Sequence, residues 1–75
     1  MSVAPVLLYT RTGCTFCAQK RAELNTRGVA FREINVSDAP QMIPELLKLT
    51  RGQRTVPVVV EGGRILIAPD GGSTF

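Results

Sequence analysis

Near its start the chain runs from an apolar segment through a short loop into two closely spaced cysteines: Val6-Leu7-Leu8-Tyr9-Thr10-Arg11-Thr12-Gly13-Cys14-Thr15-Phe16-Cys17. The apolar segment does not alternate with polar residues, which is typical of a strand covered on both faces. The residues after Cys17 are mostly good helix formers, and Gly28 suits the end of that helix. The spacing therefore predicts a strand, a tight turn at Gly13 and a helix that begins at the cysteines.

Cys14 and Cys17 are the only two cysteines, and they lie within one predicted helical turn, where their sulfurs can bond to each other. Unpaired backbone N–H groups and the positive end of the helix dipole favour a thiolate at the first position. We expect Cys14 to be an exposed, attacking thiolate, with Arg11 lowering its pKa if that side chain folds back over the loop. Cys17 should stay a protonated thiol until it resolves a mixed disulfide on Cys14.

Two other interpretations of the cysteine pair were weighed against redox catalysis. A structural disulfide that closes so short a loop would add little stability and is unusual in the cytoplasm. Half of a zinc or iron–sulfur site would need ligands from a second chain or from glutathione, because the sequence has no histidine and no third cysteine. Reversible thiol–disulfide chemistry is the interpretation we favour, and no metal ligand is predicted.

The remaining pattern predicts a small α/β domain of order β-α-β-α-β-β. After the first helix we expect a strand over residues 29–36, a helix over 44–51, a strand over 58–60 and, beyond a Gly62-Gly63 turn, a returning strand over 64–67. Ser37 or Asp38 is expected to cap the second helix, with Gln41 completing a capping box. The domain is expected to span residues 1–75, with a core over 5–67 and a flexible tail over 69–75.

Composition and charge narrow the classes of function. The 75 residues carry nine Lys or Arg against six Asp or Glu, a net charge of +3, but the basic residues are scattered. No basic run with interleaved aromatic residues is present, so no nucleic-acid partner is predicted. The longest apolar run is far shorter than a membrane span, and the N-terminus lacks a signal-peptide pattern. We therefore expect no membrane partner and a cytoplasmic protein.

The order of elements, with Cys-x-x-Cys after the first strand and Val56-Pro57 ahead of the third, resembles the thioredoxin fold. Within that fold the chain is most similar to the glutaredoxins over residues 5–67, at Tyr9-Thr10-Arg11, Gly28-Val29-Ala30-Phe31 and Arg54-Thr55-Val56-Pro57. It departs from them in three places. Thr15-Phe16 replaces the usual Pro-Tyr between the cysteines, Asp70-Gly71-Gly72 is a displaced version of the glycine and acidic motif, and the closing helix is missing. A minimal glutaredoxin-like protein, of the Uxx-star branch among other options, fits these features.

The resemblance implies how a substrate would be held. Pro57 is expected to be cis, with the main chain of Val56 pairing with the substrate like an added strand and Thr55 beside it. A trans proline that starts an edge strand is the alternative. Thr15, in place of a proline, restores a backbone N–H beside the sulfur, and Phe16 would give the substrate an apolar rim. Arg54 suits a glutathione carboxylate, while Arg51 equally suits a solvated helix end.

The function expected is therefore a glutathione-linked thiol–disulfide oxidoreductase that acts on protein or glutathione mixed disulfides. Glutathione serves as co-substrate, and no bound cofactor is expected. Two alternatives stay open: a redox-switched regulatory or binding protein, and an iron–sulfur carrier in which glutathione bridges two chains. We expect a monomer, unless a dimer compensates for the missing helix.

Overall fold

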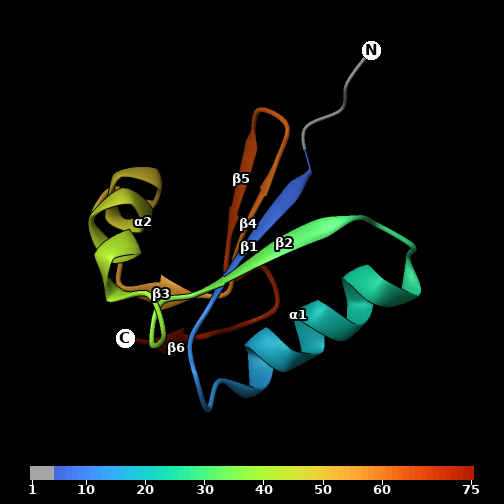
Figure 1. The fold of residues 1–75 in the computed structure, drawn as a ribbon, viewed down its shortest axis with the longest axis horizontal. Coiled ribbons are helices and arrows are strands. Elements are labelled where there is room, and N and C mark those ends of the chain that lie inside the picture. The colour runs from blue at the N-terminus through green and yellow to red at the C-terminus, as the bar shows by residue number, and fades with distance from the viewer. Residues whose placement is uncertain (1–4) are drawn as a thin grey trace.

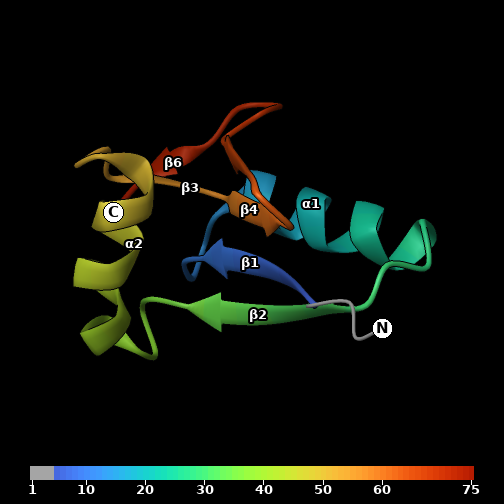
Figure 2. The same ribbon diagram turned by 90° about the horizontal axis from the view of Figure 1, so that it is seen from above.

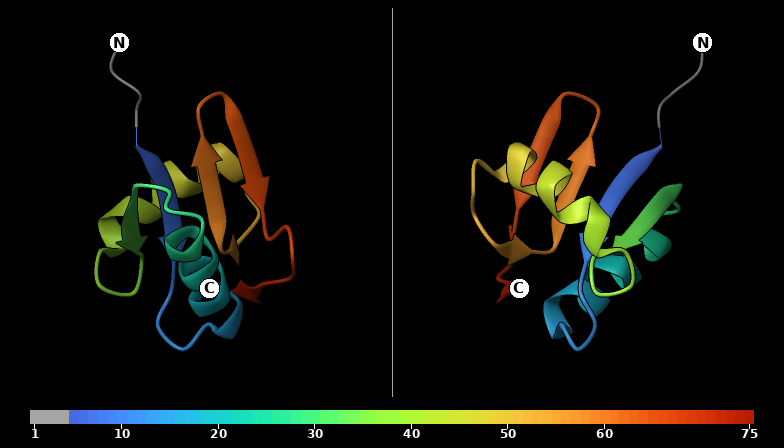
Figure 3. Two further views of the ribbon diagram at one scale, coloured as in Figure 1. Left: turned by 90° about the vertical axis from the view of Figure 1, so that its right-hand side faces the viewer. Right: turned by 60° about the vertical axis from the view of Figure 1, so that its left-hand side comes forward.

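A computed structural model describes residues 5–75, so the first four residues of the expected domain lie outside the described range. The elements follow in the order β1 (Val6–Thr10), α1 (Thr15–Thr26), β2 (Phe31–Asn35), the 3₁₀ turn η1 (Pro40–Met42), α2 (Ile43–Thr50), β3 (Thr55–Val56), β4 (Val58–Glu61), β5 (Arg64–Ile67) and β6 (Ser73–Thr74). A sheet lies between the two helices, with α1 on one face and α2 on the other (Figures 1 and 3). The predicted order is confirmed, with β3 and β6 as additional short strands.

The main sheet has the strand order β2-β1-β4-β5. β1 and β2 are parallel, because α1 carries the chain back across one face, whereas β4 and β5 form an antiparallel hairpin. β4 pairs antiparallel with β1, so the sheet centre is the apolar β1 that the sequence predicted. The carboxyl end of β1 delivers the chain to the cysteines beside the start of α1 (Figure 2).

Each face of the sheet has its own core. Val6, Leu8 and Val59 pack beneath Leu24 of α1. On the other face a larger cluster contains Tyr9, Val58 and Leu46 of α2, and it continues into the two cysteines and Val56. Leu8, Leu24 and Leu46 are at most 1% exposed. Both cysteines are therefore part of the apolar core of the domain.

The predicted N-cap of the second helix, by Ser37 or Asp38, and the predicted capping box with Gln41 are both wrong. Neither η1 nor α2 has a side-chain cap, because Pro40 opens a 3₁₀ turn and α2 begins only at Ile43. The Ser37 hydroxyl instead accepts the N–H of Thr12 in the loop before the cysteines, at 3.1 Å.

Among residues 5–75, no helix is long and apolar enough to cross a membrane.

The C-terminal residues differ from the expected flexible tail. Ser73 and Thr74 form β6, which pairs antiparallel with Val56 and Thr55 of β3. The physical reason is that β3 is a two-residue strand outside the main sheet, with main-chain groups left to pair. The segment after β5 therefore returns to the part of the molecule that holds the cysteines.

A partly buried ion pair joins α1 to the edge strand β2. Arg21 donates from Nε and Nη2 to the two Glu33 carboxylate oxygens, at 2.5 and 2.6 Å, and the Thr10 hydroxyl donates to the same carboxylate at 2.9 Å. The Arg21 hydrogen bond is the main cause that lowers the pKa of Glu33, against the opposing effect of burial. The bidentate geometry makes this contact stronger than an ordinary surface pair.

This ion pair predicts a specific acid sensitivity. Because the pKa of Glu33 is lower in the folded than in the unfolded chain, its stabilisation is present above the unfolded pKa of about 4.3 and is lost as the pH falls through the folded value. Glu33→Gln should cost roughly 1 kcal/mol of unfolding free energy at pH 7 and should flatten its decline below about pH 5. Urea titrations across pH measure this. Glu61→Gln, which removes a carboxylate with no ion pair in the described part of the chain, is the control; equal acid slopes for Glu33→Gln and wild type would contradict the assignment.

Candidate active site

Cys14 occupies the N-cap position of α1. Its backbone is extended, with φ −90° and ψ 110°, and its sulfur accepts the N–H of Cys17 at 3.1 Å. Gly13 makes the turn into this position with a φ of +80°, which favours glycine. The sequence thus folds so that the Cys14 sulfur takes the place of a capping oxygen, facing the unpaired N–H groups of the helix.

The prediction that Cys14 is exposed is wrong. The residue is only 5% exposed, because its sulfur lies against β3, 4.0 Å from the carbonyl oxygen of Val56. A hollow of about 460 Å³ borders the residue on the loop side, and its lining includes Arg11, Gly13, Thr15 and Arg21. The sulfur is therefore next to Val56, the residue before Pro57, and borders a hollow on its other side.

The two thiols have opposite acidities. Burial raises the pKa of Cys14, but hydrogen bonds from the Cys17 thiol, the Ser73 hydroxyl and the N–H groups of Cys17 and Phe16 outweigh it and bring that pKa below the ordinary thiol value. Burial, followed by the hydrogen bond to Cys14, raises the pKa of Cys17 to about 12. At neutral pH the first sulfur is the better nucleophile and the second is a protonated donor.

Pro57 lies beside the cysteines as the resemblance implied. The Val56–Pro57 peptide bond is cis, and both residues are buried. The Pro57 carbonyl accepts the N–H of Ala68 at 2.8 Å, which ties this bend to the segment after β5. Thr55 and Val56 are the two residues of β3, and in the structure their pairing partner is β6.

Arg11 and Arg54 both lie next to the C-terminal segment. Arg11 does not fold over the Cys14 sulfur. Its Nη1 donates to the carbonyl oxygen of Thr74 at 2.8 Å. The exposed Arg54 donates from Nε to the carbonyl oxygen of Phe75 at 2.7 Å and places its guanidinium 4.8 Å from the centre of that ring. Both cations therefore bind main-chain carbonyl groups of the segment that pairs with β3.

The two residues between the cysteines face outward from α1. Thr15 is exposed and lines the hollow that also borders Cys14. Phe16 is 36% exposed, and it lines a second hollow, of about 340 Å³, together with Pro57, Asp70 and Gly71. The N–H groups that stabilise the Cys14 thiolate are those of Phe16 and Cys17. The apolar ring of Phe16 therefore lies at the rim of the hollow beside Pro57.

Two residues near the site, Ser73 and Lys20, were not predicted from the sequence. Ser73 hydrogen-bonds to the Cys14 thiol, and Asp70 accepts from Lys20 of α1 at 2.7 Å. The Lys20 ammonium also binds Glu23, and these two carboxylates raise the pKa of Lys20. The only local signal for β6 is that Thr74 and Phe75 favour strands, whereas residues 69–73 before them have turn composition. Among the described residues no three His, Cys, Asp or Glu side chains gather as a metal site would require.

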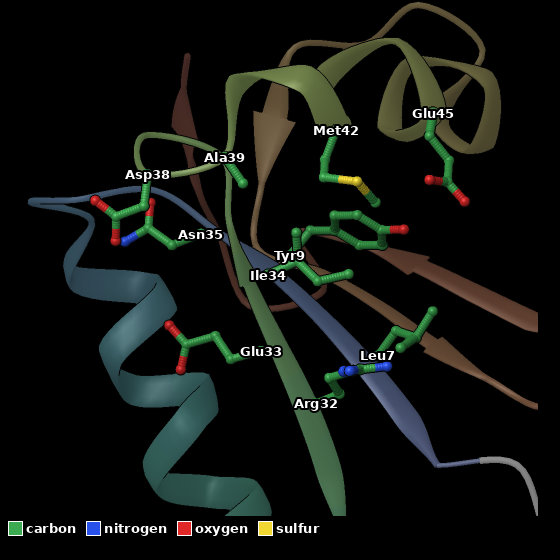
Figure 4. Close-up of a pocket in the computed structure, with 10 residues that line it drawn as sticks. All are labelled: Leu7, Tyr9, Arg32, Glu33, Ile34, Asn35, Asp38, Ala39, Met42 and Glu45. Carbon is green, nitrogen blue, oxygen red and sulfur yellow. The ribbon is translucent and has the colours of Figure 1, made fainter.

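A separate hollow of about 590 Å³ lies on the α2 face of the sheet, and Figure 4 shows the residues that line it. Leu7, Tyr9 and Ile34 form its floor, and Met42 and Glu45 approach from η1 and α2. Burial raises the pKa of Tyr9, and the Glu45 carboxylate adds to that effect. Neither cysteine lines this hollow, so it is distinct from the thiol site.

Comparison with known proteins finds relatives of this chain over most of its length. The glutaredoxin family model matches residues 6–66. N-acetyl-S-hydroxy-L-cysteine reductase of Bacillus subtilis is 32% identical over 60 residues, which are 80% of this chain and 63% of that protein. Glutaredoxin 1 of Rickettsia conorii is 34% identical over 55 residues, 72% of this chain and 54% of that protein. The chain thus spans between one half and two thirds of the length of these relatives.

Solved structures confirm the thioredoxin-like fold class. A crystal structure of a glutaredoxin from Archaeoglobus fulgidus matches with a TM-score of 0.75 and 26% identity, covering 95% of this chain and 77% of that one. A wheat glutaredoxin matches with a TM-score of 0.73 and 30% identity, covering 89% of this chain and 65% of that one.

Proposed function

Since the chain belongs to the glutaredoxin family, we propose that it is a thiol–disulfide oxidoreductase that reduces protein or glutathione mixed disulfides. The observation that carries this proposal is the split acidity of the two thiols beside the Val56–Pro57 bend. The pKa of Cys14 is below its ordinary value, whereas that of Cys17 is about 12. A poised nucleophile with a protonated partner one turn away is what disulfide exchange requires.

The reaction proceeds in two exchange steps. The Cys14 thiolate attacks one sulfur of the substrate disulfide, that bond breaks, and the other substrate sulfur leaves as a thiolate that takes up a proton. Cys17 then loses its proton and attacks the Cys14 sulfur, which expels the second substrate thiol and leaves a Cys14–Cys17 disulfide. Two electrons pass from the dithiol to the substrate, and two glutathione thiols restore the dithiol while becoming glutathione disulfide.

Glutathione is the reductant we propose, as a co-substrate with no bound cofactor. It carries two carboxylates, and Arg11 and Arg54 are cations within the same region, on either side of the Thr74–Phe75 main chain. Phe16 supplies the apolar rim, and Thr55 and Val56 supply main-chain partners. The compartment that suits this chemistry is the cytoplasm, where the glutathione pool is reduced. The partners proposed are proteins that carry disulfides.

The reductant is tested by supplying electrons from two sources. The oxidised protein is incubated with glutathione, glutathione reductase and NADPH, and separately with thioredoxin reductase and NADPH. We expect reduction at least roughly ten-fold faster with glutathione, because its carboxylates can pair with the arginines. NADPH consumption and the appearance of free thiols measure both arms. Efficient reduction by thioredoxin reductase alone would contradict glutathione as the electron source, and absence of reduction by either would contradict the oxidoreductase itself.

A further inference from the structure

The C-terminal segment Gly72–Phe75 lies along the outer edge of β3. Ser73 pairs with Val56 and Thr74 with Thr55 in antiparallel register, and the Phe75 N–H donates to the Arg54 carbonyl at 3.2 Å. Figure 2 shows β6 running beside β3 at the end of the sheet that holds the start of α1. This edge is the one that carries the main-chain groups of Val56, the residue next to the Cys14 sulfur.

Side chains hold the same segment. Arg11 donates to the Thr74 carbonyl, and Arg54 donates to the Phe75 carbonyl and lies over the Phe75 ring. The Ser73 hydroxyl hydrogen-bonds to the Cys14 thiol. The segment therefore contacts the Cys14 sulfur, the edge of β3 and both arginines at the same time. These are the groups to which the proposed function assigns the substrate.

Just before this segment the chain contacts α1. Asp70 pairs with Lys20, whose side chain is only 10% exposed, and Gly71 lies against the Phe16 ring. Beyond that point the chain is held by the short ladder with β3 and by the contacts with Arg11 and Arg54. Gly71 has a φ of +111°, and with Gly72 it supplies two residues of high backbone freedom between Asp70 and β6.

We propose that Gly72–Phe75 is an internal occupant of the substrate groove along β3, which the main chain of a disulfide substrate must displace before it pairs with Val56. This inference rests on the proposed function and adds a substrate preference to it. A substrate with an extended polypeptide main chain can form with β3 the hydrogen bonds that the segment loses. A small disulfide without such a main chain cannot. For a substrate that pairs with Val56, the apparent affinity is the intrinsic affinity multiplied by the fraction of molecules in which the groove is open.

Gly72→Ala tests the occupant directly. A Cβ atom at this position would lie 2.3 Å from the Val56 carbonyl oxygen and 2.9 Å from the Ala68 Cβ, so the main chain here has to shift and its pairing with β3 is weakened. We expect kcat/KM for a peptide–glutathione mixed disulfide to rise roughly ten-fold, because the groove opens without loss of a catalytic group. Gly63→Ala is the matched control, since a Cβ there meets nothing within 4 Å. Phe75→Ala, which removes only the ring over Arg54, should give a smaller rise if Gly72→Ala folds poorly. Unchanged kinetics in both segment variants would overturn the proposal.

A second measurement needs no catalysis. In Cys17→Ser protein, Cys14 is loaded with glutathione from an activated pyridyl disulfide or, as the matched adduct without a peptide main chain, with a methylthio group from a thiosulfonate. Hydrogen exchange of the Phe75 amide, which is bonded to Arg54, reports whether the segment is in place. We expect protection to be lost with glutathione and kept with methylthio. Equal protection in both adducts would overturn the proposal, even in a protein that catalyses disulfide exchange. Conversely, selective loss of protection in a protein without exchange activity would support the occupied groove while contradicting the proposed function.

Discussion

Cys14→Ser is expected to abolish disulfide reduction, with activity below about one thousandth of wild type, because a serine hydroxyl does not form the attacking anion at neutral pH. The structure provides the reason for assigning the attack to this sulfur. It caps α1 and receives hydrogen bonds that bring its pKa below the ordinary value, whereas burial raises that of Cys17 to about 12. The measurement is the rate of reduction of a peptide–glutathione mixed disulfide, coupled to glutathione reductase.

Cys17→Ser is the matched control for this experiment. It keeps the attacking sulfur, so glutathione can still resolve the mixed disulfide from solution, and we expect measurable reduction of glutathione mixed disulfides. Reduction of an intramolecular protein disulfide, which needs the second thiol, should fall sharply. Equal loss of activity towards glutathione mixed disulfides in the two variants would contradict these roles, as would substantial activity in Cys14→Ser.

Leu46→Ala is expected to have the largest effect on stability. Leu46 is fully buried on α2 in the cluster that contains Tyr9, Val58 and both cysteines. Removal of so well packed a side chain costs about 2–5 kcal/mol of unfolding free energy. A domain of this size has only about 5 kcal/mol to lose, so much of the variant should be unfolded at 37 °C.

Urea unfolding followed by circular dichroism measures this loss. Lys48→Ala, on the exposed side of the same helix, is the control and should change the unfolding free energy by less than about 0.5 kcal/mol. If Leu46→Ala were as stable as Lys48→Ala, α2 would not be packed on the sheet as the structure has it.

The elements that could be predicted from the sequence are those whose signal is local. The unbroken apolar β1, the glycine turn at Gly13 and the Gly62-Gly63 hairpin each follow from the preferences of a few adjacent residues, and all are present. Regular alternation along β2 places Phe31 on the α1 face and Ile34 on the α2 face. The residues alone favour a cis bond at Pro57 over a trans proline, the resemblance strengthens that prediction, and the structure confirms it.

The features that could not be predicted depend on partners distant in the chain. Arg11 and Thr74 are 63 positions apart, and Lys20 and Asp70 are 50 apart. No local pattern predicts that Arg11 binds the main-chain carbonyl of Thr74 and not the neighbouring Cys14 sulfur. Likewise, the burial of Cys14 follows from the approach of β3, whose place is set by the whole topology. For Ser73, a turn-like composition concealed a strand because its pairing partner is only two residues long.

The membership of both cysteines in the α2-side core has a consequence for electron transfer. Interconversion of dithiol and disulfide takes place inside the packing that holds the domain together, so redox state and folding form one thermodynamic cycle. If a substitution such as Leu46→Ala weakens the reduced and oxidised forms by different amounts, the midpoint potential must change by the equivalent of that difference. In a domain this small, the packing of the hydrophobic core therefore helps to set the midpoint potential of the cysteine pair.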